Sequence, residues 1–283
     1  MRNKVANRNI LLDLLAHARY EVLPTATTED KILAHLPKDR VITVTASPAK
    51  GLGITFDLAE RLGSAGYPVV PHIAARMVSG RSELAEICDR LTSAGISRIF
   101  VPGGDADPAG DYVDALGLLE DLKELGSPFE HVGITGYPES HPKIHDDLTV
   151  QAMWDKRRYA THVVSNLTFD PAVIADWLGR LRARGVTMPL LLGMPGPIDR
   201  AKLLGMAGKI GVGESTKFLS KNKGLFARLA APGGFTGERF LEQCAPALGK
   251  PGALVEGLHV FTFNQIEATE NWRTSMIDRL SRE

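Results

Sequence analysis

The stretch VITVTASPAKGLGITFDLAERLGSAGYPVVPHIA, residues 41–74, shows the unit from which this chain is built. Two short apolar runs, VITVTA and PVVPHIA, flank a segment with helical periodicity that ends at Gly66, and glycine commonly follows the last residue of a helix. Strands that are buried on both faces read as continuous apolar runs, and a helix between two such strands joins them in parallel. The stretch therefore predicts a βαβ unit.

Apolar runs of this kind occur eight times along the chain. They cover residues 19–24, 41–46, 68–74, 98–104, 131–137, 162–169, 188–196 and 257–264. Helices are predicted between them over residues 53–66, 82–95, 112–126, 148–160 and 172–185. Eight strands that alternate with helices predict an α/β fold, a (β/α)8 TIM barrel, and 283 residues suit one such barrel as a single catalytic domain, residues 1–283.

The connection before the last strand is longer than the others. Residues of about 197–256 contain several helical segments, among them residues 237–249, and predict a helical insertion on the barrel. The alternative fold, a doubly wound open sheet, requires a Gly-rich dinucleotide fingerprint after an early strand. The GLG of residues 51–53 lacks the third glycine and the acidic residue about twenty positions further on, which favours the barrel.

Composition and charge indicate a globular protein that acts on small molecules. The 33 basic residues balance the 33 acidic ones, and a chain without net charge is a poor partner for nucleic acid, which is bound by a basic face. The two cysteines, Cys88 and Cys244, lie far apart without metal-ligand spacing and are expected to be buried thiols in a reducing compartment.

The N-terminal residues predict an amphipathic helix rather than a signal peptide. Their apolar segment is interrupted by Asp13 and His17, and no small-residue cleavage site follows it. No run reaches the 18 or more apolar residues that a membrane span requires, so we expect a cytoplasmic protein without a membrane partner.

Polar and aromatic side chains follow the predicted strands, where a barrel carries its active site. These candidate residues are Glu21, Thr45, His72, Gly104, Asp105, Tyr137, Glu139, His141, Asn166 and Phe169. Glu21 lies within a strand, where a buried carboxylate needs a partner or a function. The others have plainer alternatives: His72 as a core histidine, Asp105 as a turn residue, and Glu139 as a solvated loop residue.

Signals for metal or phosphate binding are weak. The eight histidines form no HxH or HExxH pair, and GVGEST, residues 211–216, lacks the Lys and the glycine spacing of a phosphate loop. The basic residues 156–158 are typical of a solvated helix face, although Lys156 could reach a phosphate from the barrel rim.

Taken in order, the segments YEVLP, VTA, PHIA, GGD, GYPESHP, SNLTFD and LHVFTFN resemble the methylenetetrahydrofolate reductase family. The resemblance runs from residue 19 to about residue 270. It implies a barrel that reduces 5,10-methylenetetrahydrofolate to 5-methyltetrahydrofolate with a reduced nicotinamide, in most members through bound FAD.

The resemblance also implies roles for individual residues. Glu21 matches the general acid that protonates the folate and opens its five-membered ring to an iminium, work that suits a carboxyl group with a raised pKa. Asp105 matches the aspartate that holds the pterin and faces the cationic iminium. Asn166 stands where the family usually has Gln, and Phe169 ends the segment that matches the family's FFD. The remaining matches imply a cofactor-binding set of Thr45, His72, Gly104, Tyr137, His141 and Lys156.

One departure from the family concerns the flavin. Flavin-binding members read Arg-Gly-Asp after strand four, whereas this chain has Gly103 in place of the arginine. Loss of an always-charged bidentate group argues against tight FAD binding. We therefore expect direct hydride transfer from NADH or NADPH, with folate and nicotinamide as the partners.

Two alternatives remain open at this point. A pterin-dependent methyl transferase would need no nicotinamide, and a folate-binding protein without turnover would not need an acid at Glu21. The residues do not distinguish NADH from NADPH and do not fix the oligomeric state.

Overall fold

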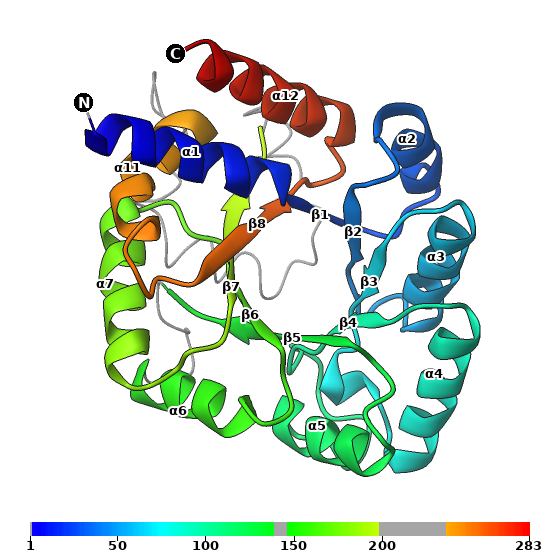
Figure 1. The fold of residues 1–283 in the computed structure, drawn as a ribbon. Helices are drawn as coiled ribbons and strands as arrows, with labels where there is room; N and C mark the ends of the chain where they lie inside the picture. Colours follow the sequence, from blue (N-terminus) through cyan, green and yellow to red (C-terminus); the bar gives the residue numbers. More distant parts are fainter. Residues whose placement is uncertain (1, 139–145, 198–235) are drawn as a thin grey trace.

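Eight parallel strands form a nearly closed barrel with helices around it (Figure 1). The computed structural model describes residues 2–138, 146–197 and 236–283. The strands are β1 (Arg19–Val22), β2 (Val41–Val44), β3 (Val69–Pro71), β4 (Arg98–Phe100), β5 (His131–Gly136), β6 (His162–Ser165), β7 (Leu190–Pro195) and β8 (Val255–Phe261). They pair in the order β3-β2-β1-β8-β7-β6-β5-β4. The predicted (β/α)8 TIM barrel is confirmed, and each apolar run overlaps one strand, although β8 begins at Val255, two residues before its run.

The two ends of this sheet, β3 and β4, meet through a single bridge between His72 and Phe100. The amide N–H of Ile73 donates to the carbonyl oxygen of Phe100 at 2.8 Å and continues this contact. The bridge brings the residue after β3 to the last residue of β4, so the C-terminal ends of all eight strands face one mouth.

The helices pack on the outside of the barrel. They are α1 (Arg2–Ala16), α2 (Thr28–His35), α3 (Gly53–Ser64), α4 (Arg81–Ser93), α5 (Ala115–Glu124), α6 (Asp146–Lys156), α7 (Pro171–Ala183), α11 (Gly237–Leu248) and α12 (Ile266–Arg282), with a short 3-10 helix, η1 (Ala75–Met77). After α3, α4, α5 and α7 the chain reverses at a glycine with positive φ, as the sequence predicts. The predicted N-terminal helix is α1, whereas α2 and α12 had no prediction.

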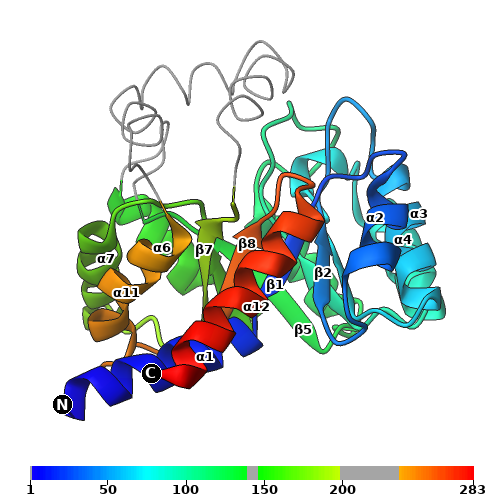
Figure 2. The same cartoon turned by 90° about the horizontal axis from the view of Figure 1, so that it is seen from above.

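The N- and C-terminal helices lie together beside β8. Helix α1 packs against α11, α12 and β8, and Figure 2 shows α1 and α12 running alongside each other. Of the predicted helical insertion, residues 198–235 lie outside the described residues, and α11 is its described part. Among the described helices, none has both the length and the apolar character needed to cross a membrane.

Two apolar clusters fill the molecule. The larger one lies between the strands and the helices and includes the fully buried Tyr20 and Trp177. The smaller one fills the barrel interior with Val70, Phe100, Val164 and Leu191. Both cysteines are buried free thiols, as expected. The inner cluster gives the polar groups at the barrel mouth an apolar floor.

Candidate active site

Glu21 lies next to two histidines, one on strand β8 and one directly after strand β3. Its carboxylate oxygen Oε2 lies 2.9 Å from Nε2 of His259 on the neighbouring strand β8. The same oxygen lies 3.8 Å from Nε2 of His72, which follows β3. Both histidines are buried, whereas about a sixth of the Glu21 side chain, 17%, stays exposed. The carboxylate therefore faces both the histidines and the barrel mouth.

These neighbours set the protonation states at the site. Burial alone would raise the pKa of Glu21, but the hydrogen bond from His259 and the charges available on His259 and His72 outweigh it, so the pKa lies below its ordinary value. Burial lowers the pKa of His72 to about 4, against the attraction of Glu21 and with the repulsion of His259. His72 is thus neutral near pH 7, which leaves the hydrogen bond from His259 as the main contribution that lowers the pKa of Glu21.

We expected a raised pKa for Glu21, as suits a general acid. This expectation is wrong as far as the surrounding protein groups determine the pKa. The physical reason is the hydrogen bond from His259, which favours the ionised carboxyl group.

Buried polar atoms at the barrel mouth, among them Nε2 of His72 and Oγ1 of Thr45, have no hydrogen-bond partner in the described part of the chain. The His72 ring packs on Phe100, with ring centroids 4.7 Å apart, which fixes its orientation. Unpaired buried polar atoms are costly, so both are available to a ligand that enters the barrel mouth.

A cavity of about 630 Å³ opens at the C-terminal ends of the strands. It brings together eight of the predicted residues: Glu21, Thr45, His72, Gly104, Asp105, Tyr137, Lys156 and Asn166. Phe169, beyond β6, does not line it. His141 and Glu139 lie outside the described residues. The cavity volume suits a ligand the size of a nucleotide or a pterin.

Charged and polar groups ring the outer part of this cavity. Asp105 is exposed and lies near Tyr137, whose pKa is raised first by burial and further by the charge of Asp105. Lys156, at the end of α6, has its pKa lowered by burial, and the charges of Asp114 and Asp155 oppose that shift. A cation and two carboxylates, Asp105 and Asp114, thus lie at the same mouth.

The segment HVFTFN, residues 259–264, anchors the end of β1. Oγ1 of Thr262 donates to the backbone carbonyl of Glu21 at 2.7 Å. The Asn264 side chain accepts from the backbone N–H of Leu23 at 2.9 Å and donates to its carbonyl at 3.0 Å. The segment therefore fixes both the side chain of Glu21, through His259, and its backbone.

Sequence reasoning missed His259 and Thr262 as site residues. The available signal was the alternation of β8, because residues two apart on a strand face the same side. His259 and Phe261 both line the cavity, and their rings meet edge to face at 4.9 Å.

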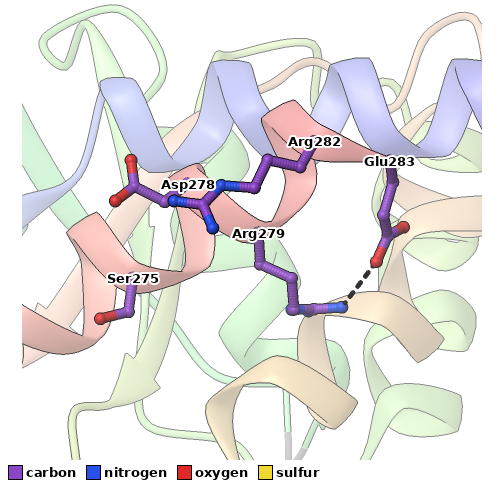
Figure 3. Close-up of a pocket in the computed structure, with 5 residues that line it drawn as sticks. All are labelled: Ser275, Asp278, Arg279, Arg282 and Glu283. Atoms are coloured by element: carbon purple, nitrogen blue, oxygen red, sulfur yellow. Dashed lines mark hydrogen bonds and ion pairs between the residues drawn. The ribbon is translucent and has the colours of Figure 1, made fainter.

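Elsewhere, a second, open hollow lies at the end of α12 (Figure 3). Its Arg279 pairs with Glu283 at 3.2 Å and with Glu242 at 2.6 Å. These surface ion pairs satisfy the arginine, and the hollow offers no group comparable to Glu21. Within the described ranges, no cluster of His, Cys, Asp and Glu side chains has the arrangement of a metal site.

The model of the methylenetetrahydrofolate reductase family matches residues 40–275. The chain belongs to the methylenetetrahydrofolate reductase family. This membership confirms the resemblance inferred from the ordered strand-end segments, and it assigns the chain to folate-linked one-carbon reduction as an oxidoreductase. The match covers every described cavity residue except Glu21.

Solved structures of other proteins share the barrel. One is a candidate lyase/mutase from Burkholderia cenocepacia J2315, 13% identical, with a TM-score of 0.50 over 100% of this chain and 87% of that one. Another is the spore cortex-lytic enzyme SleL of Bacillus megaterium QM B1551, 12% identical, with a TM-score of 0.50 over 93% of this chain and 73% of that one. At these identities the likeness concerns the fold alone.

Gly103, which stands where flavin-binding members of the family have an arginine, lines the cavity. A Cβ atom added there would meet no atom within 4 Å, whereas one added at Gly104, which has a φ of +89°, would lie 3.2 Å from the Cβ of Ala74. The chain thus leaves open space beside the cavity at the position where the resemblance places an arginine.

Proposed function

We propose that this protein reduces 5,10-methylenetetrahydrofolate to 5-methyltetrahydrofolate with hydride taken directly from NADH or NADPH. The observation that carries the proposal is the joint placement of Glu21, Asp105 and Tyr137 around one cavity at the strand ends. An acid deep in the barrel and a carboxylate at its mouth are the two groups that opening of the folate ring to a cation requires.

The proposed reaction has two steps. First, the Glu21 carboxyl group gives its proton to the folate nitrogen as the bond from that nitrogen to the bridging methylene breaks, and the electron pair stays on nitrogen. The carboxylate of Asp105 stabilises the resulting iminium. Second, a hydride passes from C4 of the nicotinamide to the methylene carbon, which is reduced to a methyl group while the nicotinamide is oxidised.

Glu21 must hold a proton to begin this sequence. A substrate that covers the exposed part of its side chain removes the remaining water, and loss of solvation raises the pKa of a carboxyl group. Substrate binding would therefore shift Glu21 from its ionised toward its protonated form, which is the form that can donate a proton to the folate.

The residues present suit a nicotinamide better than FAD. Bound FAD would supply a hydride carrier between nicotinamide and folate, and His72, Thr45 and Tyr137 could flank its ring. Its diphosphate, however, would lack the arginine that Gly103 replaces, and the Nε of the nearby Arg76 already donates to the carbonyl of Val113. These residues favour direct transfer of the hydride from the nicotinamide to the folate, with the nicotinamide over the position that a flavin would take.

The purified protein tests this proposal. We expect a preparation without the visible absorbance of oxidised flavin that nevertheless oxidises NADH or NADPH only when methylenetetrahydrofolate is present. Stoichiometric bound flavin would contradict direct transfer. Failure to oxidise either nicotinamide would favour a pterin-dependent methyl transferase or a folate-binding protein. The small-molecule partners and the cytoplasmic location belong to the same proposal.

A further inference from the structure

Among the described residues, His259 is the histidine that lies within hydrogen-bond distance of Glu21. Its ring is 2% exposed, and Phe261 and Phe100 flank it at centroid distances of 4.9 and 6.5 Å. Within this apolar enclosure, Nε2 of His259 and Oε2 of Glu21 lie 2.9 Å apart, which is hydrogen-bond distance.

We infer that His259 shares the catalytic proton with Glu21, so that the pair, rather than Glu21 alone, sets the pH range in which the proton reaches the folate. This inference rests on the proposed function. It makes His259 a positioning residue, since His259 acts through Glu21 and not on the substrate.

Other charged groups around the pair do not replace His259 in this role. His72 from β3 and His162 from β6 face the pair, but burial lowers their pKa values to about 4 and about 3, so both are neutral near pH 7. Arg19, on β1 below Glu21, lies 3.1 Å from Nε2 of His162 and keeps its charge. Asp105 and Lys156 lie at the outer part of the cavity. Among the described residues, His259 is thus the histidine in hydrogen-bond contact with Glu21, at 2.9 Å, whereas His72 lies 3.8 Å away.

The backbone holds this pair at bonding distance. Strands β1 and β8 pair directly, with Glu21 opposite Phe261, and Thr262 donates to the Glu21 carbonyl through both Oγ1 and its backbone N–H. A fixed distance allows one proton to occupy either Nε2, with Glu21 ionised, or Oε2, with His259 neutral. Transfer of that proton to the folate nitrogen leaves a carboxylate and a neutral imidazole, and a proton from solvent restores the pair.

Sharing extends the working pH range upward. A carboxyl group alone loses its proton at its own pKa, whereas a carboxylate beside an imidazole keeps one proton within the pair to higher pH. The alkaline limb of the pH–kcat profile therefore belongs to the pair and not to Glu21.

The substitution His259→Gln separates sharing from packing, because the glutamine amide can still donate to Glu21 but cannot release a proton. We expect the alkaline limb of kcat to move to lower pH by about one unit or more. His162→Gln is the matched control, since it makes the same change at a buried barrel histidine that is neutral near pH 7, and its limb should stay in place. An unmoved limb in the His259→Gln enzyme would overturn the inference.

A second measurement works on the protein without substrate. Nitrogen-15 spectra of the histidine rings should show the His259 signals changing at lower pH in Glu21→Gln than in wild type, because the imidazolium loses its carboxylate partner. Signals that do not move would also overturn the inference. If wild type fails to oxidise a nicotinamide while these signals do move, the proposed function fails and the coupling of Glu21 with His259 stands.

Discussion

At the scale of single residues, Glu21 carries the proposed chemistry. Replacing Glu21 with Gln keeps the size of the side chain and an oxygen that can accept from His259, but removes the proton to be delivered. We expect kcat to fall by about 100- to 10,000-fold, the usual contribution of general acid catalysis, while the dissociation constant for the folate changes little. Steady-state kinetics and calorimetric titration with the folate measure the two quantities.

The Glu21→Gln enzyme should remain folded, because the hydrogen bond with His259 persists in an altered form. Turnover at the wild-type rate would remove Glu21 from the mechanism. A weaker folate affinity with unchanged kcat would instead make it a binding residue.

We expect Asp105 to contribute mainly to the affinity of the enzyme for the folate. The substitution Asp105→Asn removes the negative charge at the cavity mouth, and a hydrogen bond to a charged group contributes about 1.5–3 kcal/mol. The folate dissociation constant should therefore rise by about 10- to 150-fold. Asp107→Asn is the control, because Asp107 is an exposed carboxylate of the same loop that does not line the cavity. Equal effects of both substitutions would indicate a general electrostatic contribution.

The sequence reveals a site residue when the signal lies in nearby residues, and it does not when the property depends on a partner far away in the chain. Thr45, Asp105 and Tyr137 lie at or directly after the ends of apolar runs, so the barrel rule alone assigns them to the mouth. The direction of the Glu21 pKa could not be predicted in the same way, because its partner His259 lies 238 residues away and is brought near only by the pairing of β1 with β8. Long-range strand register thus decides the protonation state.

At the scale of elements, the turn from β8 into α12 is stabilised by Asn264. This residue has a φ of 58°, a conformation that Asn tolerates better than most residues, and its side chain bonds the backbone of Leu23 and the hydroxyl of Thr28. Asn264→Ala should lower the free energy of unfolding by about 1–3 kcal/mol, because the partly buried backbone groups of Leu23 lose their partners. Urea titration measures the change.

Asn271→Ala, on the exposed face of α12, is the matched control and should change stability little. Asn264→Gly separates the two contributions, since glycine relieves the backbone strain without restoring the hydrogen bonds. If Asn264→Gly is as stable as wild type, the hydrogen bonds do not contribute and the strain accounts for the whole effect.

Helix α12 shows why some elements could not be predicted. Its buried positions include Glu270 and Arg273, which satisfy each other at 2.6 Å and also hold the hydroxyl of Tyr20, so the apolar period is interrupted. Helices α3, α4, α5 and α7 carry mostly apolar side chains at the buried positions and are followed by a glycine, and both signals are local. The buried charges of α12 can be understood only once the contact of Glu270 with Tyr20 on strand β1 is known, and the sequence does not show this contact.

At the scale of the whole molecule, the eight apolar runs were sufficient to predict the barrel, because parallel strands buried on both faces leave a continuous apolar pattern. The single-domain organisation over residues 1–283 stays a prediction. It depends on whether the part around α11, which packs against α1 and α7, unfolds together with the rest of the barrel.

The two buried thiols can test this prediction, since Cys88 lies on α4 and Cys244 on α11, which follows the long connection. Burial raises their pKa values to about 11 and about 12, and nearby carboxylates add to the shift, so neither thiol should react in the native protein at neutral pH. With increasing urea, a thiol reagent should modify Cys88 in the Cys244→Ala variant and Cys244 in the Cys88→Ala variant at the same midpoint, after correction for each variant's stability. Coincident midpoints would show that the region around α11 and the rest of the barrel unfold together as one cooperative unit. Release of Cys244 at clearly lower urea would instead make the region around α11 a separate folding unit, because local opening exposes a thiol without unfolding the remaining strands.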